Sequence, residues 1–292
     1  MAASVVLLAA GTLARATEPT VVSAFCSIAP QEFFIERVGG DLVSVKVLVG
    51  PGQSPHTFEP TPRQMAELAE SDVYFAIGLP FENRLLGRVE ELGSGIQVVD
   101  TSEGIPRRRV EDAHRRDGEH GGEHRGLPDP HTWLNPRFAK MQARNICNAL
   151  KELVPEHGEE FETNLSRLLH DLDALDAELM DALGPLAGES IYVFHPAFGY
   201  FTDAYGLRQV PIELGGMEPS ARELAGLIYH ATSAGVRVIF VQPQFSTRSA
   251  RAIAEDIGGA VVPIDPLSAD YMDNLRSIAR EVSKALREGQ AR

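Results

Sequence analysis

The chain has 292 residues, of which 43% are hydrophobic and 23% are charged, and its formal net charge at pH 7 is -14. Such a composition is typical of a soluble globular protein, and the length allows two compact lobes or one large α/β domain. The acidic balance repels phosphate backbones, which excludes nucleic acid as an expected partner.

The first sixteen residues have the pattern of a cleavable export signal. Val5 to Ala10 form an apolar run too short to span a bilayer, and Ala14 to Ala16 have the small-x-small pattern of a cleavage site. We therefore expect a signal peptide over 1–16 and a periplasmic mature protein with no membrane insertion. The alternative is a cytosolic protein with a flexible N-terminus.

Strand-like apolar runs alternate with segments of helical spacing through residues 17–155, which predicts a first α/β lobe with a mostly parallel sheet. Cys26 falls in a predicted strand and Cys147 in a predicted helix, so we expect buried free thiols rather than a disulfide. The strands are expected at Thr20 to Ile28, Val43 to Val49, Val73 to Ile77 and Ile96 to Val99, and the helices at Gln31 to Val38, Arg63 to Ala69, Glu82 to Leu92 and Pro136 to Leu153.

A His-rich segment interrupts this first lobe at 103–128. Nearly every residue there is charged, glycine or histidine, so the segment cannot bury a core and is expected to be a mobile surface loop. It carries His114, His120 and His124. Six arginines dilute these histidines and would repel cations: Arg107, Arg108, Arg109, Arg115, Arg116 and Arg125.

A long helix without intervening strands is predicted at 156–184. Between Glu159 and Leu183, apolar side chains recur at spacings of three and four, and Gly184 with Pro185 ends the pattern. About 37 Å of helix would form a stiff spine between two lobes. A surface helix within one domain is the alternative. The recurring residues are Phe161, Leu165, Leu168, Leu169, Leu172, Leu175 and Leu179.

Alternating strands and helices return in residues 185–292, which predicts a second lobe. The fold class expected is therefore α/β, with two lobes that each contain a mostly parallel four-stranded sheet flanked by helices, joined by one long rigid helix. The strands are expected at Ser190 to Phe194, Arg208 to Ile212, Val236 to Val241 and Ala260 to Ile264, and the helices at Ala221 to Ser233, Thr247 to Asp256 and Asp270 to Arg287.

Three of the nine histidines, His56, His131 and His195, lie beside prolines in predicted loops. Asp265 is followed by a proline in the same way, after the last predicted strand. Ligands of open α/β sheets bind beyond the carboxyl ends of the strands, and three imidazoles with one carboxylate would suit a four-coordinate zinc ion. On their spacing alone, each of these histidines is more often an ordinary capped or hydrogen-bonded loop residue than a metal ligand.

Several ordered motifs, from about Thr20 to the C-terminus, resemble the zinc and manganese solute-binding proteins of ABC importers. The motifs are GPGQSPHTFEPTP (50–62), DPHTWLNP (129–136), FHPAFGYF (194–201), GGMEPSA (215–221) and VQPQFS (241–246). The resemblance implies two lobes joined by one long helix. It also implies metal ligands at His56 and His131 from the first lobe, and at His195 and Asp265 from the second.

The resemblance also bears on the metal and on the partners. Manganese receptors of this family usually have Glu at the position of His195, and imidazole suits zinc better than manganese. We therefore expect Zn²⁺ as the transported ligand, Mn²⁺ being the alternative, and an ABC permease with its ATPase as the partner. Binding one ion gives no reason to form oligomers, so a monomer is expected.

Two other functions compete with this interpretation. A zinc hydrolase needs an open coordination position, but four protein ligands would close the site, and the chain has neither an HExxH pair nor a Gly-x-Ser-x-Gly motif to accompany Glu59 as a base. The fold alone does not separate a transport receptor from an adhesin or a metal-storage protein. We therefore expect no catalysis, with the adhesin as an alternative.

Zinc-type family members often carry a similar His-rich insertion, so His114, His120 and His124 are candidates for an accessory metal site. A solvated loop with incidental histidines explains them equally well. Whether a metallochaperone loads this loop is left open by the sequence.

Overall fold

The computed structural model describes residues 22–91, 93, 95–110, 128–212, 221–233, 235–245 and 248–290. The predicted signal peptide and the three histidines of the predicted accessory site lie outside these ranges. Residues 103–110 of the predicted mobile loop pack against both lobes: Ile105 is buried, and the Arg108 amide donates to the Tyr200 hydroxyl of the second lobe at 3.0 Å. No helix in the described ranges has the length and apolarity needed to cross a membrane.

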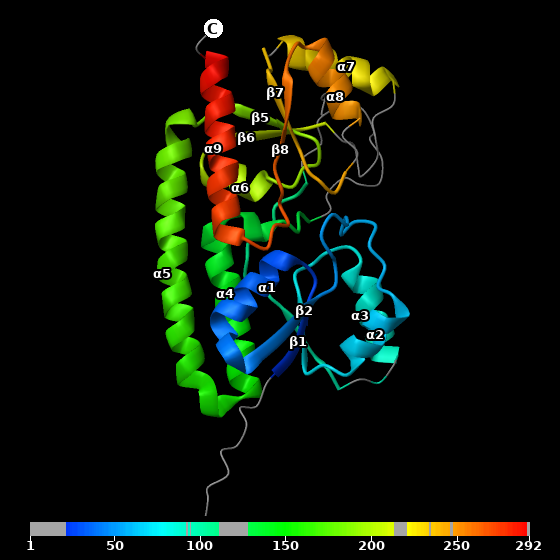
Figure 1. Ribbon diagram of the computed structural model, residues 1–292, viewed down its shortest axis with the longest axis vertical. Helices are drawn as coiled ribbons and strands as arrows, with labels where there is room; N and C mark the ends of the chain where they lie inside the picture. Colours follow the sequence, from blue (N-terminus) through cyan, green and yellow to red (C-terminus); the bar gives the residue numbers. More distant parts are fainter. Residues whose placement is uncertain are drawn as a thin grey trace, which may run out of the picture.

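The first lobe is built on a parallel four-stranded sheet, as the sequence predicted, and its strand order is β2-β1-β3-β4. Helices lie on both sides of the sheet (Figure 1), and β3 is accordingly buried at all four positions. The strands are β1 Val22–Cys26, β2 Val43–Val47, β3 Val73–Ala76 and β4 Gln97–Asp100, and the helices are α1 Ala29–Gly39, α2 Pro62–Ala69, α3 Glu82–Glu91 and α4 Pro136–Leu153.

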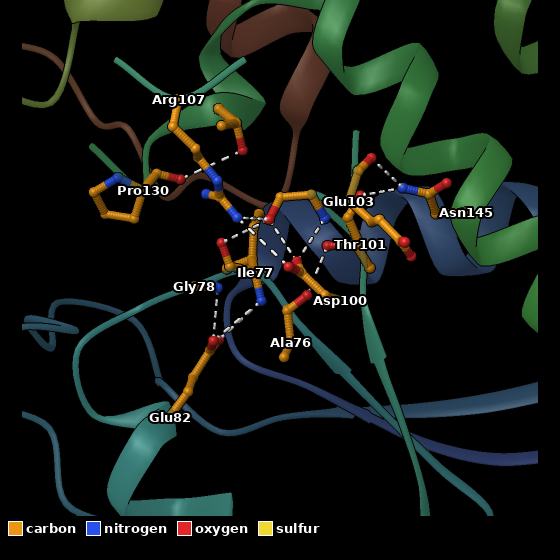
Figure 2. A network of polar contacts seen from close by, with 12 residues as sticks. Ala76, Ile77, Gly78, Glu82, Asp100, Thr101, Glu103, Arg107, Pro130 and Asn145 are labelled. Carbon is orange, nitrogen blue, oxygen red and sulfur yellow. Dashed lines mark hydrogen bonds and ion pairs between the residues drawn. The ribbon is translucent and has the colours of Figure 1, made fainter. Parts of the chain in front are cut away.

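A buried carboxylate fixes the turn at the carboxyl end of β3. Glu82 is 2% exposed, and its side chain accepts hydrogen bonds from the backbone amides of Ile77 (3.1 Å), Gly78 (2.7 Å) and Leu79 (3.0 Å). Figure 2 shows this carboxylate pointing toward the turn. Burial raises the pKa of Glu82, although the hydrogen bonds from Ser27 and from the turn oppose that shift.

The segment after β4 is tied down in the same region (Figure 2). The guanidinium of Arg107 lies 3.5 Å from a carboxylate oxygen of Asp100. Asn145 of α4 donates to the carbonyl oxygens of Thr101 (2.9 Å) and Glu103 (3.0 Å). These contacts, all within the first lobe, explain why residues 101–107 follow a defined path despite their polar composition.

The second lobe repeats the arrangement, with a parallel sheet in the order β6-β5-β7-β8. The short helix α6 was not predicted, because six residues are too few to show a helical period. The strands are β5 Ser190–Val193, β6 Arg208–Pro211, β7 Val238–Val241 and β8 Ala260–Pro263, and the helices are α6 Gly199–Ala204, α7 Ala221–Ser233, α8 Arg248–Asp256 and α9 Tyr271–Gln290.

The long helix α5, Gly158–Leu183, has 26 residues and runs alongside both lobes (Figure 1). Its apolar face packs against α1 and α4 of the first lobe and against α9 of the second. Arg37 pairs with Asp171 at 2.6 Å, and Arg276 pairs with Glu178 at 2.6 Å, so ion pairs from both lobes also meet this helix. The buried residues of α5 are Phe161, Leu165, Leu168, Leu172, Leu175, Leu179 and Leu183.

One apolar core runs continuously from the first lobe through α5 into the second. Tyr271, at the start of α9, stacks on Phe33 and meets the edge of Phe34, with ring centroids 5.5 and 4.7 Å apart. Separating the lobes widely would expose these rings to water, which is unfavourable by about 25 cal/mol for each Å² of apolar surface. Motion between the lobes is therefore expected to be small.

Both cysteines are buried and free, as predicted. Burial raises the pKa of the Cys26 thiol well above its ordinary value and raises the pKa of Cys147 to about 11. At neutral pH both side chains are protonated thiols, so they act as small apolar core residues rather than as nucleophiles.

Candidate metal centre

The three histidines singled out in the sequence meet at one point. One ring nitrogen from each of His56, His131 and His195 lies within 4.8 Å of the others. The ring centroids are 4.5 Å apart for His56 and His195, 5.3 Å for His131 and His195, and 5.8 Å for His56 and His131. Two rings come from the first lobe and one from the second, so the cluster lies where the lobes meet.

A buried carboxylate orients His131. Nδ1 of the ring lies 2.7 Å from Oδ1 of Asp129, which also accepts the backbone amide of His131 at 3.0 Å. An ionised carboxylate can only accept, so Nδ1 carries the proton and Nε2 keeps its lone pair for a metal ion. Asn135 accepts the backbone amide of Arg137 and begins α4, which holds the end of the same loop.

His195 is held by the neighbouring strand. It lies just beyond β5, and Gln242, just beyond β7, accepts the His195 amide at 2.9 Å and donates to the His195 carbonyl oxygen at 3.2 Å. Gln242 is fully buried, so this double hydrogen bond is shielded from water. The ring of Phe245 stacks on the imidazole, with centroids 4.6 Å apart and planes 23° apart. Backbone and ring of His195 are therefore both fixed before any cation arrives.

His56 comes from the loop after β2. Ser54 accepts its backbone amide at 3.3 Å, and the following Phe58 packs edge-on against Phe81 at 5.0 Å. Burial, with smaller contributions from the neighbouring rings of His195 and His131, lowers the pKa of His56 to about 2. The imidazole is therefore neutral at physiological pH, which is the form that binds metal.

Asp265 is not part of the group of mutually close ligand atoms among the described residues. Its Oδ1 accepts Gln244 Nε2 at 2.7 Å and the Leu267 amide at 2.9 Å. The loop that carries it is fastened to the first lobe, because Trp133 Nε1 donates to the Pro266 carbonyl oxygen at 2.7 Å. A role for Asp265 as the fourth ligand stays a prediction, as does the accessory role of the three histidines outside the described residues.

Sequence reasoning missed the residues that hold the ligands. Asp129 and Gln242 lie within the motifs DPHTWLNP and VQPQFS, but neither received a role. The carboxylate two residues before His131 was a local signal that could have been used, since metal-binding histidines commonly donate to such a partner. Glu59, considered as a hydrolytic base, has a 73% exposed side chain and lies 3.7 Å from Arg84.

Three imidazoles from two lobes, with one ring nitrogen of each close together, form a group that could hold a borderline transition metal ion. Together with two lobes that each contain a parallel sheet, and one long helix that connects them, they are the features of a metal-binding solute-binding protein. The chain belongs to the family described as "Zinc-uptake complex component A periplasmic", which matches residues 25–285. The family consists of metal-binding components of uptake systems rather than enzymes.

Individual relatives and solved structures support membership of this family. The Bacillus subtilis protein named "High-affinity zinc uptake system protein ZnuA" is 29% identical over 242 residues, which cover 82% of this chain and 76% of that protein. A crystal structure of ZnuA matches with a TM-score of 0.84 at 39% identity and covers 91% of this chain and 99% of that one. The laminin-binding protein Lmb of Streptococcus agalactiae, described as having adhesin and metal transporting activity, matches at 25% identity with a TM-score of 0.78 and coverages of 91% and 99%.

Proposed function

We propose that this protein captures Zn²⁺ between its lobes and delivers it to an ABC permease driven by its ATPase. The observation that carries this proposal is the convergence of His56, His131 and His195, with ring nitrogens within 4.8 Å of one another. The proposal includes export through a cleavable signal peptide over 1–16, a monomeric receptor, and Asp265 as the fourth ligand.

Zinc is preferred to manganese because of the donor set. Manganese binds oxygen ligands better, whereas three imidazoles favour zinc, and affinity for such a site also rises from manganese to zinc. The name of the Bacillus subtilis relative agrees with this preference. A manganese receptor is the alternative within the same family.

Capture would tie the two lobes together through the ion itself. His56 and His131 belong to the first lobe and His195 to the second, so an ion bound to all three links loops that no covalent crosslink joins. The continuous apolar core keeps the lobes close, so closure consists of small shifts of the ligand loops rather than a wide hinge motion. Release would follow when the permease separates these loops.

Metal titration tests this proposal. Metal-stripped protein is titrated with Zn²⁺ against a chelator of known affinity, and the titration is repeated with Mn²⁺. We expect nanomolar or tighter zinc binding, about -12 kcal/mol or better, much weaker manganese binding, and a large loss for His195→Ala. His170→Ala is the matched control, because His170 is exposed on α5. The proposal would be refuted if the original protein binds zinc weakly and neither His195→Ala nor His170→Ala changes that affinity.

A second role in adhesion is suggested by the similarity to the Streptococcus agalactiae protein, which is described as an adhesin as well as a metal transporter. Surface plasmon resonance with immobilised laminin tests it. We expect binding to be absent for a dedicated transport receptor. Saturable binding that survives in His195→Ala would instead favour an adhesin with a separate surface for its partner.

A further inference from the structure

Arg108 lies at the boundary between the two lobes and contacts both. Its side chain is only 14% exposed. Nη1 is 3.7 Å from Oδ2 of Asp129 in the first lobe, and Nε is 3.4 Å from Oδ2 of Asp203 in α6 of the second lobe. One guanidinium group therefore stands between the carboxylate that orients His131 and the helix that follows His195.

The backbone around Arg108 is fixed by the loop of Asp129 and by α6, the same two segments that its side chain contacts. The Arg108 amide donates to the Tyr200 hydroxyl at 3.0 Å, and the Arg108 carbonyl oxygen accepts the Asp129 amide at 2.9 Å. The Tyr200 hydroxyl in turn donates to the Pro106 carbonyl oxygen at 3.3 Å. Main-chain and side-chain contacts of Arg108 thus join the loop of His131 to α6, which begins four residues after His195.

The first residue of α6 leaves room for this arrangement. A Cβ atom added at Gly199 would overlap Nη1 of Arg108, so the guanidinium lies directly against the helix backbone. Any side chain at residue 199 would push the guanidinium away while leaving its charge in the protein. This offers a second way to disturb the contact, independent of removing the arginine.

Arg108 also supplies the charge that compensates Asp129. The Asp129 side chain is 1% exposed, and its Oδ2 has no hydrogen-bond partner in the described part of the chain. A buried carboxylate is costly unless an opposite charge lies nearby. With Oδ1 bound to the His131 ring and Oδ2 facing Arg108, the orientation of the carboxylate is set from both sides.

We propose that Arg108 is a positioning residue for zinc capture. It acts through Asp129 on the ring of His131. Through Asp203 and Tyr200 it fixes the position of that ring relative to His195 across the lobe boundary. This inference rests on the proposed function, since it assigns the residue to the same metal site. Partners that orient metal ligands typically contribute 10- to 100-fold to metal affinity.

The test compares zinc affinity, measured by chelator competition, in Arg108→Ala, Arg108→Lys and Arg107→Ala. We expect about 10- to 100-fold weaker binding for Arg108→Ala and partial recovery for Arg108→Lys. Arg107→Ala is the matched control, because Arg107 pairs with Asp100 within the first lobe (Figure 2). This variant should bind zinc with the same affinity as the original protein.

A double-variant comparison separates positioning from general stabilisation. If Arg108 acts through Asp129, adding Arg108→Ala to Asp129→Asn should lower affinity much less than it does in the original protein. Absorption of the Co²⁺-loaded protein, which reports ligand geometry, should change in Arg108→Ala and not in Arg107→Ala. Gly199→Ala, which displaces the guanidinium without removing it, should weaken zinc binding as well. If Arg108→Ala does not fold, Arg108→Lys and Gly199→Ala decide.

Three results would overturn the inference: zinc affinity within twofold of the original in Arg108→Ala, an equal loss with and without Asp129→Asn, or unchanged binding in Gly199→Ala. The original protein is titrated first. If it binds no zinc, the proposed function fails and this inference fails with it, whereas normal binding in the original and in Arg108→Ala refutes the inference alone.

Discussion

Acidification should destabilise the metal-free protein through His56. Burial lowers the pKa of this imidazole to about 2, whereas its value in the unfolded chain is about 6.5. Below pH 6.5 the unfolded chain therefore binds a proton that the folded protein does not bind, and the folded state loses stability as the pH falls from 6.5 toward 2. Above that window His56 contributes no pH dependence.

The expected size follows from the same two values. Between pH 7 and pH 5 the loss is about 2 kcal/mol, from 1.36 kcal/mol for each pH unit below 6.5. This result does not depend on whether the folded pKa is 2 or 3, because both lie well below pH 5. It is a substantial part of a typical stability of about 5–15 kcal/mol.

Urea unfolding in the presence of a chelator measures this effect, with Trp133 fluorescence as the probe because Trp133 is the only tryptophan and is buried. His56→Asn should remove about 2 kcal/mol of the difference in unfolding free energy between pH 7 and pH 5. His170→Asn, on the exposed surface of α5, should leave it unchanged. An equal pH dependence in the original protein and in His56→Asn would refute the reasoning, because it would mean that the His56 loop opens freely without metal.

Three further predictions concern the supports of the site. Gln242→Leu should lower the unfolding free energy by about 1–3 kcal/mol, because it leaves the backbone amide and carbonyl of His195 without their partner; urea unfolding measures this, and no change would contradict it. Trp133→Phe should cost a similar ~1–3 kcal/mol by removing the donor to Pro266, and hydrogen exchange in 264–267 should rise, whereas unchanged exchange would show that other contacts hold that loop. Deleting 111–124 should leave zinc affinity at the main site nearly unchanged and lower the zinc stoichiometry above one equivalent, and an unchanged stoichiometry in calorimetry would exclude the accessory site.

The fold was predictable because its elements repeat with clear periods. The strands of both sheets were found from apolar runs, and α5 from the spacing of Phe161 and the leucines that follow it. The convergence of the three histidines was also predictable in part, since loops beyond the carboxyl ends of parallel strands meet at one edge. What brought them to a single point was the packing of one lobe against the other, which no local pattern specifies.

The supports of the site could not be predicted in the same way. Gln242 is buried and polar, and only its pairing with the backbone of His195 explains why that is tolerated. Arg108 looked like one of several cations that dilute a His-rich segment, yet its side chain is largely buried between Asp129 and Asp203. Both roles depend on residues far away in the sequence, so composition and spacing carried no sign of them.

The arrangement of the site has a consequence for release. His131 and His195 are fixed by Asp129 and Gln242 before a cation binds, so little ordering is required when an ion is captured. If an ion is bound there, the same rigidity predicts that it would not leave through spontaneous loosening of those two ligands. The loop of His56 is the less constrained partner, because the His56 backbone amide donates to the Ser54 hydroxyl at 3.3 Å within the same loop rather than to a residue of a neighbouring strand. A permease that displaced this first-lobe loop would remove one imidazole, expose the ion to water and leave the continuous core between the lobes intact.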